Sequence, residues 1–154
     1  MSENAAETGS ASAPDLWFSF VRTHRVMIRE IERRLAAADL PVYAWYDVLW
    51  GLESGQDGSR RMHELADALA IERYNLTRLV DKLETDRLVT RTRSMEDGRA
   101  AFVSITEDGK ILRRQMWAVY QSTVADLFLA QFDGGQQRDF SAALVRAAEA
   151  ARGA

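Results

Sequence analysis

The stretch Glu64–Glu84, ELADALAIERYNLTRLVDKLE, holds two short helical patterns with almost no connection between them. In each pattern, apolar or small side chains recur at three- and four-residue steps, as on one face of a helix. The first set is Leu65, Ala66, Ala68 and Leu69, and the second is Leu76, Leu79, Val80 and Leu83. The two patterns predict helices at about 63–69 and 72–87.

Two short helices in direct succession favour a helix-turn-helix, in which the second helix places its first side chains against base edges in a major groove. That role needs long, polar or amide side chains at the start of the second helix. Arginine suits guanine, asparagine suits adenine, and hydroxyl groups suit phosphate. The residues that meet this need are Arg73, Tyr74, Asn75, Thr77 and Arg78. Since short helices also abut in other domains, the spacing alone leaves a solvated surface as the alternative.

A strand period follows at 89–93 and 101–105, with a turn between the strands that contains Glu-Asp-Gly. A hairpin in this position predicts a wing. Arg91 and Arg93 on its strand would follow the DNA backbone, and Arg99 at its tip would enter the minor groove. Residues 60–99 hold nine basic and eight acidic side chains, so affinity must come from the arrangement of charge. A mixed-charge surface hairpin is the alternative.

Further helical segments flank this region. A long amphipathic helix is expected from Asp15, its predicted cap, to the break at Asp39–Pro41. The aromatic-rich segment 42–53 predicts a buried helix, and Ser54–Ser59 predicts a turn. After Thr106, another predicted cap, the helical pattern continues to Phe132. The sequence Asp133-Gly134-Gly135 is expected to break it before a last helix.

Composition excludes several classes of protein. The 154 residues carry a formal net charge of -3 and no cysteine, which rules out disulfides, cysteine-bound zinc and thiol-based sensing. No apolar run approaches the roughly 18 residues of a membrane span, and the polar residues 1–13 are expected to form a disordered leader. We therefore expect a cytoplasmic protein without a membrane partner. The sequence lacks a phosphate loop, a nucleophile elbow and a metalloprotease motif, so we expect neither an enzyme nor a cofactor or metal site.

Four stretches resemble motifs of the multiple-antibiotic-resistance regulator (MarR) family of winged-helix transcription factors. They occur in the order and spacing that those motifs have in the family. They are Arg61–Ile71, Leu76–Arg91, Glu96–Ala100 and Ser104–Lys110, which resemble the family's strand-plus-helix entry, recognition helix, wing tip and helix start. With WYDVLWGL in the second helix, the likeness spans about 15–132. The chain departs from the family at Arg87, where glycine is usual, at His63, where a serine or threonine cap is common, and at Gly98, where arginine is frequent.

The resemblance implies a mainly α fold with a small β-hairpin wing: four helices, two strands and two helices, with a helical dimerisation base. The implied parts are a leader (1–13), a dimerisation helix (14–38), a winged helix-turn-helix (39–106) and dimerisation helices (107–154). A homodimeric repressor of this kind would bind a pseudo-palindromic DNA operator. The resemblance also makes Arg61 a phosphate contact and Asp97 the residue that orients Arg99. Independently, the large apolar side chains of the terminal helices exceed what a small winged-helix core can bury, which favours a homodimer.

Members of the family often release DNA when a small aromatic anion binds, so an aromatic or phenolic effector is implied here. The expected ligand-binding residues are His24, Tyr43, Trp45, Tyr46, Asp47 and Trp50. The alternative is that these aromatic residues form ordinary core and that His24 is a satisfied core or interface group. For the whole chain, the alternative function is a winged-helix module that binds protein instead of DNA. Such a module would not need the arginine and amide residues at both the helix start and the wing tip.

Overall fold

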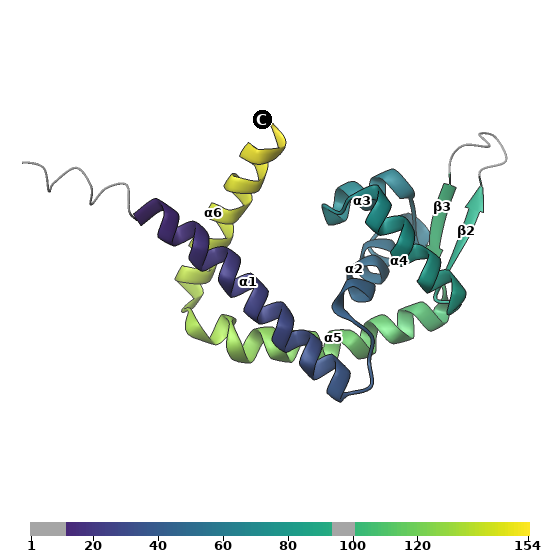
Figure 1. Ribbon diagram of the computed structural model, residues 1–154, viewed down its shortest axis with the longest axis horizontal. Helices are drawn as coiled ribbons and strands as arrows, with labels where there is room; N and C mark the ends of the chain where they lie inside the picture. The colour runs from purple at the N-terminus through teal and green to yellow at the C-terminus, as the bar shows by residue number, and fades with distance from the viewer. Residues whose placement is uncertain (1–11, 94–100) are drawn as a thin grey trace, which may run out of the picture. The chain divides into compact units, whose positions relative to one another are not determined.

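The computed structural model describes residues 12–93 and 101–154 (Figure 1). In chain order the elements are α1 (Ser12–Ala37), α2 (Tyr43–Glu53), the 3-10 turn η1 (Gln56–Gly58), β1 (Ser59–Arg61), α3 (Met62–Leu69), α4 (Arg73–Thr85), β2 (Val89–Arg93), β3 (Ala101–Ile105), α5 (Glu107–Leu127), the 3-10 turn η2 (Leu129–Gln131) and α6 (Gly134–Arg152). The predicted fold class, mainly helical with a small hairpin wing, is confirmed.

The chain divides into two compact units. The first contains α1 as far as Ile31 together with the chain from Gln121 onward, and the second runs from Glu32 to Tyr120. The predicted winged helix, 39–106, lies within the second unit. Helix α5 is continuous across the border at Gln121.

The sheet has three antiparallel strands in the order β1-β3-β2. The predicted hairpin strands have the observed bounds, and their register pairs Val89 with Ile105 and Arg93 with Ala101. Strand β1 pairs Arg61 with Phe102 on the other edge of β3. It was expected only from the resemblance, because a strand of three residues is too short to show an alternating pattern.

A single apolar cluster holds the winged helix together. Its buried members come from α2, α3, α4 and both hairpin strands: Val48, Leu49, Leu52, Leu65, Ala66, Leu76, Val80, Leu83, Val89 and Val103. Helix α4 contributes Leu76, Val80 and Leu83, which repeat at helical spacing and are fully buried. Truncating one such leucine to alanine typically costs about 2–5 kcal/mol. This burial fixes which face of α4 points away from the core.

Three helices end in the same backbone turn without glycine. Asp39 after α1, Ala70 after α3 and Arg87 after α4 have φ angles of 57°, 54° and 59°. At the end of α4, the amide of Leu88 donates to the carbonyl of Leu83 at 2.9 Å, the bond that defines a Schellman motif. A left-handed conformation costs a residue with a side chain about 1–2 kcal/mol. Arg87 nevertheless adopts a left-handed conformation of the kind that glycine favours, so α4 stops at Thr85 instead of reaching the predicted 87.

The start of α1 differs from the prediction. The helix begins at Ser12, so Asp15 lies in its first turn and is not its cap. A carboxylate in that turn still interacts favourably with the positive end of the helix dipole. Ser12 and Ala13 fall in the predicted leader but are helical; the remainder of that leader, residues 1–11, lies outside the described residues.

The two predictions for the later helices have different outcomes. Thr106 does cap α5, because its Oγ1 accepts a hydrogen bond from the Gly109 amide at 3.1 Å. The long helix was predicted to reach Phe132, but α5 ends at Leu127 and η2 follows. The expected break at Asp133 is instead the cap of α6: Asp133 Oδ1 accepts from the Gln136 amide at 2.8 Å, and Gly134 opens the helix.

The left-handed turns predict an unusual pair of substitution effects. Ala70→Gly should raise the free energy of unfolding by about 0.5–1 kcal/mol, because relief of the backbone strain outweighs the added chain entropy. Ala68→Gly, at an exposed position inside α3, should lower it by about 1 kcal/mol. Urea unfolding at a fixed protein concentration measures both changes. Equal losses in the two variants would show that Ala70 is not strained.

Candidate nucleic-acid interface

The start of α4 presents polar side chains to solvent. The five residues predicted to face the major groove are all exposed: Arg73, Tyr74, Asn75, Thr77 and Arg78. They occupy the first two turns of the helix, in which Leu76 is the buried residue. The helix start also supplies backbone amides and a positive dipole end, both of which favour phosphate. The structure therefore brings this predicted set together on one surface.

Three of these side chains have contacts that restrict their orientation. The guanidinium of Arg78 lies over the ring of Tyr74, with its Cζ 5.8 Å from the ring centre, and the Tyr74 side chain is 70% exposed. A cation–π contact of this kind holds a flexible arginine near one orientation. The hydroxyl of Thr77 donates to the carbonyl of Arg73 at 2.9 Å. The hydroxyl proton of Thr77 is thus directed toward the helix and away from solvent.

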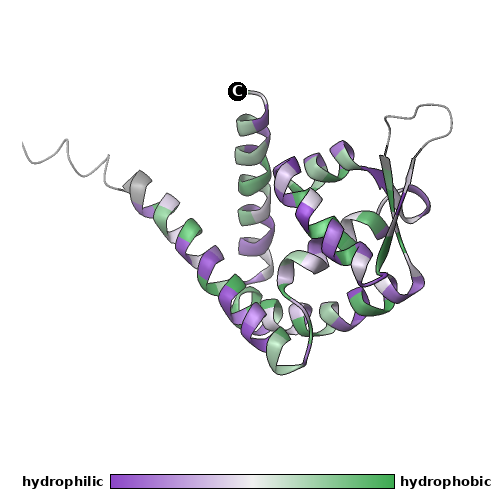
Figure 2. Ribbon diagram, turned by 45° about the vertical axis from the view of Figure 1, so that its right-hand side comes forward, coloured by the Kyte–Doolittle hydropathy of each residue, from purple (hydrophilic) through white to green (hydrophobic). Residues whose placement is uncertain are grey.

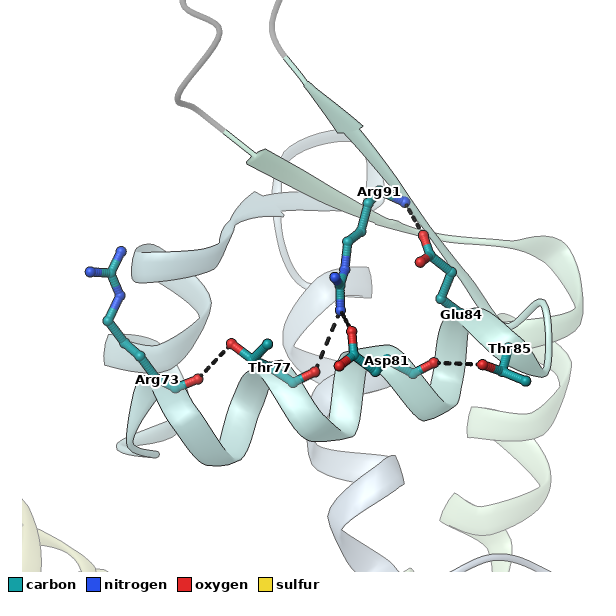
Figure 3. Close-up of polar contacts among 6 residues, drawn as sticks. All are labelled: Arg73, Thr77, Asp81, Glu84, Thr85 and Arg91. Carbon is teal, nitrogen blue, oxygen red and sulfur yellow. Dashed lines mark hydrogen bonds and ion pairs between the residues drawn. The ribbon is translucent and has the colours of Figure 1, made fainter.

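Arg91 on β2 lies across α4 (Figure 3). Its Nη2 forms an ion pair with Asp81 and donates to the carbonyl of Thr77 at 3.4 Å. The Arg91 backbone amide donates to Glu84 Oε2 at 3.1 Å. Its side chain is 31% exposed, in contrast with the exposed arginines of α4. The predicted role of Arg91 as a backbone contact stays a prediction, and sequence reasoning did not identify these partners on α4.

Arg61 lies at the junction of β1 and α3. Its side chain is exposed, its guanidinium lies 5.1 Å from the centre of the Phe102 ring, and its amide donates to Glu64 Oε2 at 3.3 Å. Because α3 begins at Met62, His63 lies inside the first turn and does not occupy the cap position assigned to it. Arg61 thus has an exposed guanidinium at a helix start, and its predicted phosphate contact stays a prediction.

The wing tip is not part of the described structure. Arg93 lies at the end of β2, and the structure describes its backbone only. Gly98, Asp97 and Arg99 fall within 94–100, outside the described residues. Their predicted roles at the minor groove therefore stay predictions.

The aromatic residues of α2 form part of a larger cluster with α5. The rings of Tyr43, Tyr46, Trp117 and Tyr120 pack with centroid separations of 5.1–6.2 Å. The hydroxyl of Tyr43 donates to that of Tyr120 at 3.4 Å. Sequence reasoning selected Tyr43 and Tyr46 but missed their partners on α5. The spacing of Trp117 and Tyr120, three residues apart on one helix, is the signal that could have identified them.

The other predicted ligand residues do not share one environment. Trp45 packs against the winged-helix core, whereas Trp50 is 47% exposed. Asp47 is half-buried, and its charge contributes to the raised pKa of Tyr43. His24 is exposed on α1 and belongs to the first unit, whereas the other five residues belong to the second.

Burial is the main influence on the titration of the two tyrosines. Desolvation raises the pKa of Tyr43 far above its ordinary value, and the hydrogen bond with Tyr120 and the charge of Asp47 act in the same direction. Desolvation also raises the pKa of Tyr46, although the nearby Arg113 opposes that effect. Both phenols thus stay protonated at neutral pH, and Tyr43 uses its proton in the hydrogen bond to Tyr120.

The first unit exposes many large apolar side chains. The ribbon of Figure 2, coloured by hydropathy, shows apolar residues interspersed with polar ones along α1 and α6. The exposed members are Leu16, Trp17, Phe18, Phe20, Val26, Leu127, Leu129, Phe140, Leu144 and Val145. Trp17, the largest of them, is 62% exposed. Apolar surface on this scale normally marks a site of association.

A three-stranded sheet, a recognition helix with an exposed polar start and a hairpin beside it define a winged helix-turn-helix. Comparison with known proteins specifies the family. The model of the MarR family matches residues 40–100. The transcriptional repressor IacR of Pseudomonas putida is 31% identical over 121 residues, which are 79% of this chain and 67% of IacR. The chain therefore belongs to the MarR family of transcriptional regulators.

Solved structures agree with this assignment at the level of the fold. Sco3205, a MarR family regulator from Streptomyces coelicolor solved in complex with DNA, has a TM-score of 0.83 at 24% identity, over 91% of this chain and 88% of its own. BpsR of Bordetella bronchiseptica, whose DNA binding is regulated by 6-hydroxynicotinic acid, has a TM-score of 0.71 at 17% identity. The match covers 87% of this chain and 98% of BpsR. The chain spans about two thirds of the length of the curated relatives that it matches.

The relatives confirm the prediction of a regulator instead of an enzyme. Within the described parts of the chain, no helix has the length and apolar character needed to span a membrane. Over the same residues, no group of three or more histidine, aspartate or glutamate side chains is placed to hold a metal ion.

The raised pKa of Tyr43 predicts how stability changes at high pH. Above pH of about 10 the unfolded chain loses the phenol proton while the folded protein keeps it, so the free energy of unfolding falls as pH rises. One such group contributes a slope of up to about 1.4 kcal/mol per pH unit. Tyr43→Phe should make the fall between pH 10 and 11 shallower by part of that amount. Urea unfolding at several pH values measures the slope. If the free energy of unfolding falls equally with pH in parent and variant between pH 10 and 11, the raised pKa of Tyr43 is contradicted. As a control, the two proteins should show the same pH dependence below pH 9.

Proposed function

We propose that this regulator binds a pseudo-palindromic DNA operator as a homodimer and represses transcription there. Helix α4 enters the major groove and the hairpin of β2 and β3 lies along the adjacent minor groove. The observation that carries the proposal is the exposed row of Arg73, Tyr74, Asn75, Thr77 and Arg78, held outward by the buried face of α4. The DNA complex of Sco3205 and the repressor activity named for IacR support the same function.

Each side chain of this row has a distinct proposed role. Asn75 recognises adenine through its amide, and Arg73 and Arg78 contact guanine or phosphate. Tyr74 contacts a phosphate oxygen, and Thr77 does so by rotating its hydroxyl away from the Arg73 carbonyl. Arg61 adds a phosphate contact beside α3, and at the wing Asp97 orients Arg99 for the minor groove. Arg93 follows the DNA backbone from the end of β2.

The homodimer is proposed to form through the exposed apolar side chains of the first unit. A chain of this size that exposes so many of them needs a partner surface, and a second copy provides a self-complementary one. Two copies of α4 related by a twofold axis then address half-sites about one helical turn apart, 10–10.5 base pairs from centre to centre.

We also propose that a small aromatic anion releases the DNA. Tyr43, Tyr46, Asp47 and Trp50 on α2, together with Trp45 and with His24 on α1, remain the proposed ligand residues. On ligand binding, the Tyr43 hydroxyl exchanges its hydrogen bond to Tyr120 for one to a carboxylate or phenolate, and the exposed ring of Trp50 can stack on an aromatic ligand. The aromatic acid named for BpsR is a compound of this chemical class.

In vitro selection of duplexes from random DNA tests the DNA-binding proposal. The selected sequences should contain two related half-sites, and binding should weaken linearly with the logarithm of salt concentration. Repeating the binding assay with a panel of aromatic acids tests the effector. If no sequence is enriched and a partner protein is captured by the same surface, the alternative of a protein-binding winged helix is correct.

Asn75→Ala is expected to relax the preference at one base pair in each half-site. The loss of one bidentate amide contact should reduce discrimination there by about 1–3 kcal/mol, with little effect on non-specific affinity. Competition binding with duplexes altered at single positions measures the change. Arg99→Ala provides the contrast, because the loss of one charged group should weaken binding to all sequences and lower the salt slope by about one. If the Asn75→Ala variant and the parent protein show the same base preference at every position of the half-site, Asn75 does not have the proposed role.

Leu144→Glu on α6 is expected to dissociate the dimer, because it places a charge in a surface that the partner must desolvate. Sedimentation velocity should show a shift toward monomer, with a parallel loss of operator affinity. The control is Ile111→Glu, which adds the same charge at an exposed apolar residue of the second unit. A Leu144→Glu protein that remains dimeric would exclude the α6 surface from the interface.

A further inference from the structure

The strand of the wing and the recognition helix are joined at three points by one residue, Arg91 (Figure 3). We propose that Arg91 is a positioning residue, which acts through Asp81 and Glu84 to set the angle of α4 relative to the wing and thereby the base preference of the protein. The inference rests on the proposed DNA-binding function. It assigns Arg91 a task different from the phosphate contact that the sequence suggested.

The three contacts follow one stripe of α4. The partners Thr77, Asp81 and Glu84 are spaced four and three residues apart, so they lie above one another on the same side of the helix. The ion pair and the bond to the Thr77 carbonyl use the side chain, and the bond to Glu84 uses the backbone amide of β2. Contacts spread over two turns restrain both the rotation of α4 about its axis and its sliding along the strand.

The core alone does not supply this restraint. Leu76, Val80 and Leu83 fix the depth of α4, but apolar contacts have little directional preference, so they permit small rotations. Base recognition depends on direction, because a bidentate hydrogen bond requires the donor pair to lie in the plane of its base. The ion pair and hydrogen bonds of Arg91, on the exposed side of α4, add the directional restraint that the buried side lacks.

The geometry of Arg91 also argues against a simple phosphate contact. Its Nη2 already donates to a carboxylate and a carbonyl, and its Nε is buried without a hydrogen-bond partner among the described residues. A phosphate that contacts this guanidinium would lie close to the Asp81 carboxylate with which the arginine is already paired. The Asp81 carboxylate, 57% exposed on the recognition helix, would then repel the same phosphate.

The test compares the parent with Asp81→Asn on the selected operator and on a duplex with scrambled half-sites. Bulk electrostatics predicts tighter binding for Asp81→Asn, because a negative charge is removed and Arg91 is released. The positioning role predicts the opposite. Affinity for the operator should fall about tenfold, which is the size of effect expected for two coupled residues. Affinity for the scrambled duplex should fall by less. Discrimination, the ratio of the two affinities, should therefore fall.

Glu72→Gln is the matched control. Glu72 precedes the first residue of α4, is exposed and makes no capping hydrogen bond through its side chain. The substitution removes the same charge from the same helix without touching Arg91. Binding should be unchanged or tighter, with discrimination equal to that of the parent.

Arg91→Ala and the double variant Asp81→Asn/Arg91→Ala complete a cycle. If the two residues act as one unit, Arg91→Ala should lower discrimination, and the double variant should be no worse than the poorer single variant. An ion pair this exposed contributes little to global stability, so all variants should fold, which circular dichroism and thermal unfolding verify. If Arg91→Ala does not fold, Asp81→Asn alone decides the question.

The outcomes separate the two proposals. Failure of the parent to select any duplex would overturn the proposed function. A parent that binds its operator, with Asp81→Asn tighter and equally selective and Arg91→Ala losing about one unit of salt slope, would show that Arg91 is a phosphate contact. That result would overturn the positioning role and leave the proposed function intact.

Discussion

The burial of one face of α4 is the constraint on which the rest of the winged helix depends. Leu76, Val80 and Leu83 are fully buried against α2, α3 and the hairpin strands. Because residues spaced by about one helical turn lie on the same face, burial of these three places the other side of α4 in solvent. Asn75 and Arg78 are exposed because they lie on that outward face, and Arg73 is exposed in the first turn of the helix. The chemistry of the surface thus follows from the packing beneath it.

The sequence determined the elements of this fold better than their ends. The hairpin strands have the predicted bounds because both segments are rich in residues that favour strands, Val and Thr in 89–93 and Phe, Val and Ile in 101–105. The helix ends were harder to predict, since Ala70 and Arg87 adopt left-handed conformations that their residue types do not signal. At α6 the signal was present but misinterpreted: Asp133 with Gln136 three residues later is a capping box, although two glycines intervene.

The candidate interface shows the same difference between local and tertiary information. The exposed row on α4 could be predicted because it depends on helical spacing within one element. The partners of Arg91 could not, because they depend on how β2 aligns with α4 across ten residues of sequence. Likewise Trp117 joins Tyr46 only after α5 returns to α2. The predicted roles at Asp97 and Arg99 fall in the one internal segment that the structure does not describe.

The hydroxyl of Thr106 lies where three segments meet. It accepts from the Gly109 amide in the first turn of α5, and it lies 2.9 Å from the Arg87 carbonyl and 3.0 Å from the Leu88 carbonyl between α4 and β2. At Gly109 an added Cβ would lie 2.3 Å from the Leu88 carbonyl, so no larger residue fits without displacing that backbone. Thr106 therefore connects three segments by hydrogen bonds, without a long intervening loop: the end of the recognition helix, the base of the wing and the start of α5. A tilt of α5 at its first turn would therefore displace the end of α4 and the base of the hairpin together.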